Sequence, residues 1–95
     1  MVLQFVKLKS SLPEEELISK AKERKPEFKA IPGLLQKFYV KMKETGSYGG
    51  VYIWDNKESL IAFKDSDLAK SIPQAYKVVE EPNIEIMNIL FKLRD

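Results

Sequence analysis

Lysine, tyrosine, tryptophan and carboxylate side chains must carry any chemistry that this sequence performs, because its 95 residues include neither His nor Cys. The absence of His removes the usual acid or base that titrates near neutral pH and the commonest ligand of zinc and haem iron. The absence of Cys removes disulfides, thiolate nucleophiles and Cys-ligated metal centres. The acidic pairs Glu80 with Glu81 and Asp65 with Asp67 lack the context of a metal-binding loop, so we expect no metal.

Lys37 is the candidate general base. It lies in an apolar stretch from Leu34 to Met42, and burial would lower the pKa of its ammonium group. Gln36 beside it is a second polar side chain that would face a cavity, a partner or an edge. The alternative is that Lys37 protects a sheet edge from further strand pairing, and both interpretations stay open.

Aromatic side chains are the candidates for lining a ligand pocket. Each Tyr or Trp combines an apolar ring with a polar tip, which suits a small organic ligand. The alternative is that they are ordinary core and interface aromatics. The candidates are Tyr39, Tyr52, Trp54, Phe63 and Tyr76.

The first half of the sequence predicts a strand followed by a helix. Strand formers run from Val2 to Leu8, and Ser11 with Glu14 has the spacing of a helix capping box. Apolar residues then recur at helical spacing as far as Phe28. Pro26 should kink or interrupt this helix.

The middle of the sequence predicts a β-hairpin and a second helix. Leu34 to Met42 and Gly49 to Trp54 are the two strands, joined by a turn at residues 44–47. Asp55 and Glu58 stand three apart and mark the start of the next helix.

The last third predicts a short helical turn, a loop and a final strand. The residues from Asp65 to Asp67 cap the turn, which Pro73 ends, and residues 76–82 form the loop. The final strand runs from Ile84 to Leu93. The order βαββαβ predicts one ferredoxin-like α+β domain over residues 1–95, with a four-stranded antiparallel sheet.

Apolar residues on both faces of the predicted sheet indicate a homodimer. Val51 and Ile53 alternate with Tyr52 and Trp54, so neither side of this strand is polar. Helices can cover only one face, and the other would expose more apolar surface than monomers usually tolerate. In the last strand Asn88 is a polar interruption that would bond across the dimer or to a ligand.

Charge and hydropathy argue against nucleic-acid and membrane partners. Sixteen basic and 14 acidic residues leave a net charge of +2, and the apolar runs are far shorter than the roughly 20 residues that span a bilayer. The N-terminal stretch has no signal-peptide pattern. We therefore expect a cytoplasmic protein.

Three stretches resemble the YdhR-like monooxygenases of the antibiotic biosynthesis monooxygenase superfamily. They are PGLLQKFY at 32–39, GGVYIWD at 49–55 and AFKDSDLAKSIP at 62–73. The resemblance implies a dimeric α/β barrel in which two sheets pack face to face, with a ligand pocket in each subunit between sheet and helices. Members of the superfamily include cofactor-free oxygenases, haem degraders and isomerases, so fold alone does not decide the activity.

The resemblance also assigns individual positions. Trp54 resembles the pocket Trp of several superfamily oxygenases, which implies a catalytic part for it. Haem degraders carry a His near the position of Lys64, so haem degradation is disfavoured here. Where quinone-forming oxygenases carry a pocket Asn, this sequence offers Gly50 or Gln4.

These observations lead to the hypothesis of a cofactor-independent monooxygenase that acts on a small aromatic or polyketide-like substrate. Such chemistry needs a base, a dry pocket and donors for a developing oxyanion. The alternatives are a non-catalytic small-molecule binder or a purely structural homodimer. An RNA-recognition motif shares the element order, but the third strand lacks that motif's leading basic-Gly-aromatic sequence.

Overall fold

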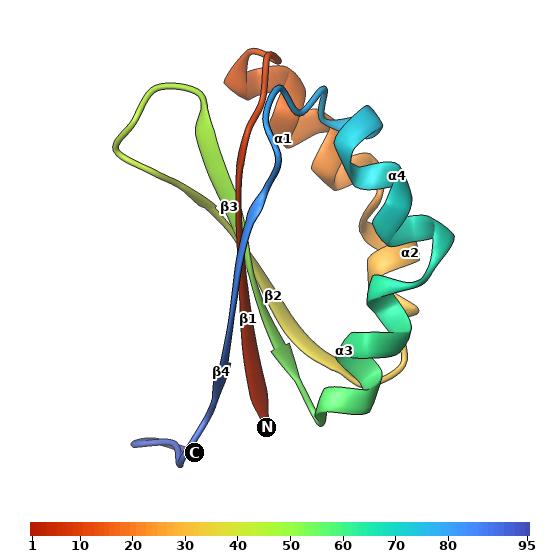
Figure 1. The fold of residues 1–95 in the computed structure, drawn as a ribbon, viewed down its shortest axis with the longest axis vertical. Coiled ribbons are helices and arrows are strands. Elements are labelled where there is room, and N and C mark those ends of the chain that lie inside the picture. Colours follow the sequence, from red (N-terminus) through yellow and green to blue (C-terminus); the bar gives the residue numbers. More distant parts are fainter.

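The computed structural model describes all 95 residues and contains one four-stranded sheet with helices on one face (Figure 1). The strands lie in the order β2-β3-β1-β4, and every neighbouring pair is antiparallel. The ferredoxin-like fold predicted from the sequence is therefore confirmed. In chain order the elements are β1 (Val2–Lys9), α1 (Glu14–Glu23), α2 (Lys25–Lys29), β2 (Leu34–Lys41), β3 (Ser47–Trp54), α3 (Lys57–Lys64), α4 (Asp67–Ala75) and β4 (Asn83–Asn88).

The main core lies between the sheet and the helices. Tyr52 and Trp54 of β3 are buried with Val2 of β1, whereas the alternating residues Val51 and Ile53 are only partly buried. This is the alternation expected of a sheet with one covered face. Phe63 of α3 completes an aromatic group, with its ring centroid 5.4 Å from that of Trp54.

A bulge in β2 decides which of its side chains face the helices. Leu34 and Gln36 pair with consecutive residues of β3, so Leu35 is left without a partner. Strict alternation from Leu34 would place Gln36 on the inner face and Lys37 on the outer face. The extra residue shifts the alternation by one, and Lys37 and Tyr39 point toward the helices.

The predicted cap of the first helix is wrong. Pro13 occupies the N-cap position of α1 and makes no side-chain cap. The Ser11 hydroxyl instead donates to the carbonyl of Lys77 at 3.3 Å. Ser10 also bonds across, donating to the carbonyl of Tyr76, because the chain after α4 returns alongside the end of β1.

The first helical region is two helices rather than one kinked helix. α1 ends at Glu23, with Arg24 as its C-cap, and Pro26 lies at the start of α2 rather than in the interior of a long helix. Proline suits this position because the first amides of a helix have no intrahelical acceptor. Phe28 is buried from the short second helix.

The starts of the later helices are set by side-chain caps. Asn56, not Asp55, caps α3 by accepting a hydrogen bond from the Ser59 amide at 2.9 Å. Ser66 caps α4, within the segment predicted for that role. Pro73 does not end this helix, which continues to Ala75, because a missing amide hydrogen so near the C-terminus disturbs only the last turn.

β3 and β4 have different limits from those predicted. β3 begins at Ser47, two residues early, because the hairpin keeps pairing up to the turn. β4 ends at Asn88 rather than Leu93. Its last partner in β1 is Val2, and one further bond joins the Ile89 amide to the Met1 carbonyl. Beyond that point no neighbouring strand remains to pair with.

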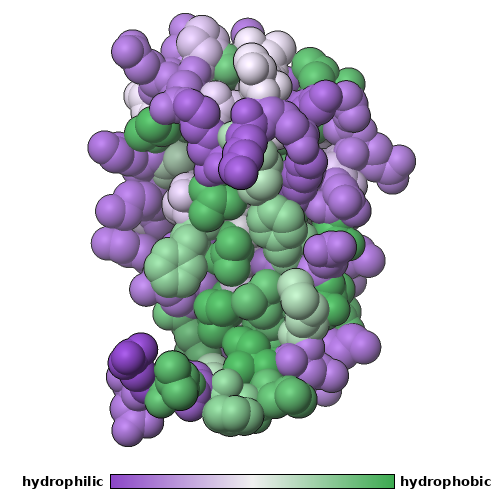
Figure 2. Space-filling view, turned by 90° about the vertical axis from the view of Figure 1, so that its left-hand side faces the viewer, coloured by the Kyte–Doolittle hydropathy of each residue, from purple (hydrophilic) through white to green (hydrophobic).

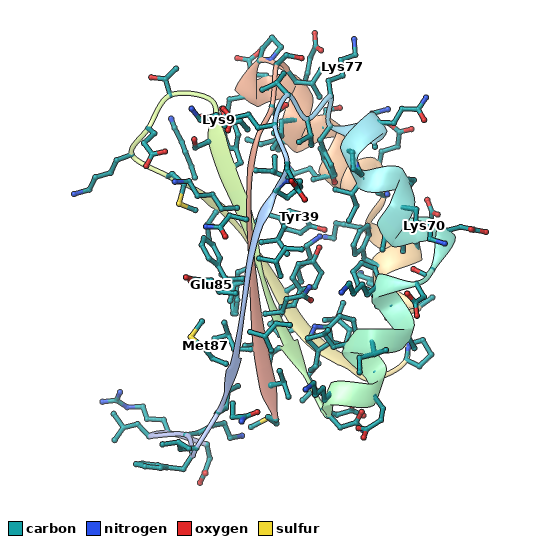
Figure 3. All side chains as sticks on the ribbon, in the orientation of Figure 1. Lys9, Tyr39, Lys70, Lys77, Glu85 and Met87 are labelled. Atoms are coloured by element: carbon teal, nitrogen blue, oxygen red, sulfur yellow. The ribbon has the colours of Figure 1, made fainter.

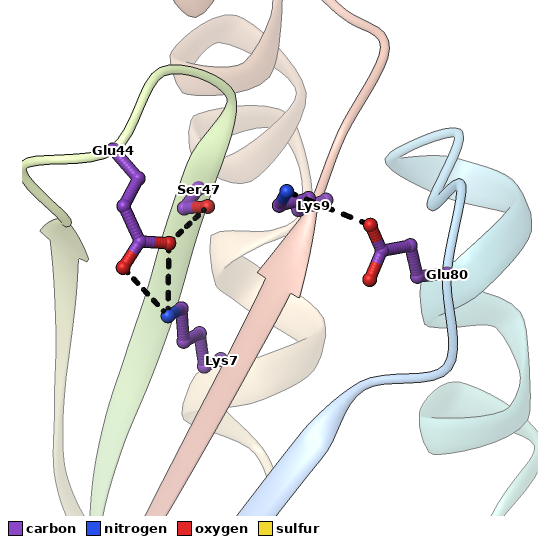
Figure 4. A network of polar contacts seen from close by, with 5 residues as sticks. All are labelled: Lys7, Lys9, Glu44, Ser47 and Glu80. Carbon is purple, nitrogen blue, oxygen red and sulfur yellow. Dashed lines mark hydrogen bonds and ion pairs between the residues drawn. The ribbon is translucent and has the colours of Figure 1, made fainter.

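Two ion pairs tie the hairpin turn and the chain before β4 to the end of β1 (Figure 4). The Lys7 ammonium lies 3.0 Å from the Glu44 carboxylate, which also accepts a bond from Ser47. Lys9 lies 3.5 Å from Glu80. All four charged groups contact solvent, so each pair stabilises the fold only weakly. No helix of the protein is both long and apolar enough to cross a membrane.

Replacing Gly33 with alanine should destabilise the fold. Gly33 has a φ of +80°, and an added Cβ would overlap Ser59 and lie 2.5 Å from an Asp55 oxygen. We expect the free energy of unfolding to fall by about 2–4 kcal/mol, measured by urea denaturation. Gly46→Ala is the matched control, since Gly46 also has a positive φ but an added Cβ would make only an ordinary contact, 3.6 Å from the Ser10 carbonyl oxygen, and it should lose only about 1 kcal/mol. Equal losses would contradict this account.

Candidate functional site

The Lys37 amine lies among aromatic rings on the inner face of the sheet. Its Nζ atom is 3.8 Å from the ring centroid of Phe28, 4.3 Å from that of Tyr39 and 4.5 Å from that of Tyr52. Ring faces attract an ammonium group, but they accept a proton from it only weakly. No carboxylate pairs with Lys37. The amine is therefore held in place without a strong hydrogen-bond acceptor.

A narrow apolar cavity lies beside this amine, between the inner face of the sheet and the helices α1 and α4. About 40 Å³ of it is open to the centre of a water-sized sphere, enough for one or two waters. Tyr39 points into the space between sheet and helices (Figure 3). The polar or aromatic side chains in the lining are Lys37, Tyr39, Tyr48, Tyr52 and Tyr76.

Gly50 makes room for the lysine stem. A Cβ at this position would lie 3.1 Å from Lys37 Cε and 3.0 Å from a ring carbon of Tyr52. Both contacts are tighter than side chains normally make. The absence of a side chain at Gly50 thus lets Lys37 lie flat across β3.

Arg24 brings a second cation to the same region. Its Nη2 atom donates to the Ser71 hydroxyl at 2.8 Å, and its guanidinium lies 5.7 Å from the Phe28 ring and 5.6 Å from the Tyr76 ring. Arg24 likewise forms no ion pair with a carboxylate. The site therefore holds two positive groups and no negative one.

These surroundings shift several pKa values. Burial, with a smaller contribution from the Arg24 charge, lowers the pKa of the Lys37 ammonium group to about 7. Burial raises the pKa of the Tyr76 hydroxyl to about 12, and it also raises those of Tyr39 and Tyr52. At neutral pH the site therefore combines a partly neutral amine with phenols that stay protonated.

Two buried polar atoms at the site have no hydrogen-bond partner. They are the Tyr76 hydroxyl and Nε of Arg24. Buried polar groups are normally satisfied, and an unsatisfied one costs about 1–3 kcal/mol. A polar ligand atom reaching the Tyr76 hydroxyl would remove part of this cost.

Trp54 and Phe63 lie behind the cavity and do not line it. Trp54 is fully buried, and its indole N–H donates to the side-chain oxygen of Gln4 at 3.0 Å. Its ring stacks on Tyr52, with centroids 6.0 Å apart and planes 2° from parallel. Trp54 therefore contacts the lining residue Tyr52, and its predicted catalytic part stays a prediction.

Gln36 lies on the far side of Lys37, in an open groove between α2 and β2. We call this the α2–β2 groove; about 280 Å³ of it is open to the centre of a water-sized sphere. Lys37 and Tyr39 belong to both the groove and the cavity, so they form the wall between them. The other residues of the groove are Lys25, Phe28, Lys29, Leu34, Leu35 and Gln36.

The structure brings four of the seven predicted site residues to the cavity: Lys37, Tyr39, Tyr52 and Tyr76. Sequence reasoning missed Arg24 and Phe28. Both follow Ala21 at helical spacing on the buried side, and that periodicity could have placed Arg24 toward the core. Its neighbours on α4 could not be read from the sequence, since Ser71 lies 47 residues away.

Comparison with known proteins places this chain in a family. The model of the family described as "Putative mono-oxygenase ydhR" matches residues 2–93. The chain belongs to this family. No curated protein matches this YdhR-family chain.

Solved structures share the fold of this YdhR-family chain at low sequence identity. A protein of unknown function, NE2512 from Nitrosomonas europaea, has 20% identity and a TM-score of 0.77, over 96% of this chain and 90% of that one. SnoaB, a cofactor-independent oxygenase from Streptomyces nogalater, has 11% identity and a TM-score of 0.76, over 99% and 97%. A putative antibiotic biosynthesis monooxygenase from Deinococcus radiodurans has 14% identity and a TM-score of 0.74, over 100% and 98%.

Replacing Lys37 with methionine should change how stability depends on pH. The folded-state pKa of about 7 lies below the ordinary value of 10.5, so the unfolded chain binds more protons between these two pH values. Relative to Lys37→Met, the wild-type free energy of unfolding should therefore rise with pH from 7 upward, by at most about 1.4 kcal/mol per unit. Urea denaturation at several pH values measures this.

The control for this titration is Lys64→Met, which removes an exposed lysine at the end of α3. It should keep the wild-type pH dependence. A constant difference between wild type and Lys37→Met from pH 6 to 9.5 would mean that Lys37 keeps an ordinary pKa.

Proposed function

We propose that this protein is a cofactor-independent monooxygenase of a small aromatic or polyketide-like substrate, with Lys37 as its general base. The observation that carries the proposal is the Lys37 amine, seated among three aromatic rings beside an apolar cavity without any paired carboxylate. SnoaB, which shares the fold, is described as a cofactor-independent oxygenase, and the family is described as "Putative mono-oxygenase ydhR".

The first step is proton transfer. The neutral amine of Lys37 takes the proton from an acidic hydroxyl of the substrate and becomes an ammonium group. A pKa near the working pH is what a general base requires. The ammonium and the nearby Arg24 guanidinium then stabilise the substrate anion in a largely apolar site, where charge interactions are stronger than in water.

The second step consumes O₂ and needs no other oxidant. The electron-rich anion passes one electron to O₂, and the resulting radical and superoxide combine to form a C–O bond. The peroxide accepts the proton from Lys37. Loss of the ring C–H proton then drives O–O cleavage, which leaves a carbonyl and releases water. The balance is substrate-H₂ plus O₂ giving the oxidised ketone or quinone plus H₂O.

The tyrosines supply donors and shape. Tyr39 and Tyr76 keep their hydroxyl hydrogens at neutral pH because burial raises both pKa values, so each can donate to a developing oxyanion. Tyr52 forms part of the apolar wall. Trp54 and Phe63 hold the Tyr52 ring from behind, at centroid distances of 6.0 and 5.7 Å.

We also propose that the protein works as a homodimer joined through the outer face of the sheet. Phe38 and Met87 are 53% and 46% exposed, and Met87 points away from the helices (Figure 3). Figure 2 shows apolar side chains gathered over much of this face. The chain after β4 adds Leu90 and Phe91, which are 89% and 82% exposed. Apolar surface of this extent is typical of an interface.

The second candidate function is a purely structural homodimer without catalysis. The cavity is too small for a ring system while Lys37 lies across it, which favours a protein whose site is a packed core. Oxygen consumption separates the two candidates.

Lys37→Met should strongly reduce the rate of oxygen uptake. With anthrones, quinols and polyketide-type phenols in an oxygen electrode, we expect kcat to fall by at least about 100-fold, because a general base typically contributes 10²- to 10⁴-fold. The wild-type rate should rise with pH through about 7, as Lys37 loses its proton. Lys64→Met should leave the rate unchanged. No uptake by the wild type across this panel would contradict the monooxygenase proposal.

Charge placed on the outer face should separate the dimer. Light scattering after size exclusion should give twice the chain mass at micromolar concentration for the wild type and the single mass for Phe38→Glu with Met87→Glu. The matched control is Ile18→Glu, which places a charge on α1 at a residue of similar exposure, 43%. This variant should stay dimeric. A monomeric wild type would overturn the proposal.

A further inference from the structure

The α2–β2 groove is a positively charged surface without a negative counterpart. Three lysines line it, Lys25 and Lys29 from α2 and Lys37 from β2, and no acidic residue does. None of the three belongs to an ion pair. The only acidic residue of α2, Glu27, lies at a different hollow, between α2 and α3.

The two lysines of α2 repel each other when no anion lies in the groove. Lys25 and Lys29 stand at positions i and i+4, where like charges destabilise a helix. Pairing with an acidic neighbour can offset such repulsion, as Lys20 pairs with Glu23 on α1. An anion in the groove would supply the missing partner for both side chains.

The groove borders the cavity. The side chains of Lys37 and Tyr39 are the shared wall, and Tyr39 is 45% exposed. A flexible lysine held only by ring faces can change rotamer without breaking a hydrogen bond or an ion pair. Its displacement would join the small apolar cavity to the larger, more polar groove.

We infer that the ligand of this site is an organic acid, whose rings enter the apolar cavity while its carboxylate lies in the α2–β2 groove against Lys25 and Lys29. The inference rests on the proposed function for the chemistry at the rings, and it adds the substrate class. The apolar end matches the lining of Tyr52 and Tyr76, and the Gln36 side chain borders the groove as an additional polar group.

Matched ligands test the inference. 6-Hydroxy-2-naphthoate and its neutral amide, 6-hydroxy-2-naphthamide, carry the same rings and the same phenol. Titration calorimetry at pH 7 and low salt should show the acid binding at least about fivefold more tightly, with the preference shrinking at higher salt. The double variant Lys25→Gln with Lys29→Gln should remove the preference and leave amide binding unchanged.

The control variant removes the same net charge from another helix. Lys57→Gln with Lys64→Gln alters two exposed lysines of α3 that line none of these hollows. It should keep the preference for the acid. An equal loss of preference in both double variants would overturn the inference, since overall charge rather than the groove would then account for it.

Oxygen uptake with the same two ligands distinguishes this inference from the function on which it rests. Equal binding of acid and amide, with uptake from both, would overturn the inference and leave the monooxygenase proposal standing. A preference for the acid that depends on Lys25 and Lys29, without uptake from either ligand or from the phenol panel, would support the groove and overturn the oxygenase proposal.

Discussion

The burial of the Lys37 amine among aromatic rings is the interaction on which the site depends. Removing an ammonium group from water is costly, and ring faces compensate for only part of that cost. Three features make the position possible: the bulge at Leu35 turns Lys37 inward, Gly50 leaves space for its stem, and α2 brings Phe28 over it. The result is an amine that exchanges a proton near neutral pH.

The same absence of counter-ions connects the cavity with its surroundings. Lys37 and the two lysines of α2 line the α2–β2 groove, whose lining has no acidic residue, and neither they nor Arg24 belong to an ion pair. Leaving the groove positive raises the energy of the ligand-free protein and favours the binding of an anion. The charge pattern and the proposed chemistry are thus two consequences of one arrangement.

The two faces of the sheet differ in how far their apolar side chains are buried. The inner face forms a compact core around Trp54, which is fully buried. The outer face and the residues after β4 expose large apolar side chains such as Phe38 and Phe91. With only 13 of 95 residues buried, the chain has a thin core for its size, and burial against a second copy would add stability where the single chain lacks it.

The sequence by itself determined the order of the strands and the limits that the absence of His and Cys places on the chemistry, because strand patterns, turn residues and composition are local properties. It also nominated Lys37, Tyr39, Tyr52 and Tyr76. Only the tertiary structure decided that Lys37 faces inward, that Arg24 joins it, and that β4 stops at Asn88. These outcomes depend on partners distant in the chain: a bulge is defined by the neighbouring strand, Arg24 is held by Ser71, and a strand ends where its neighbour does.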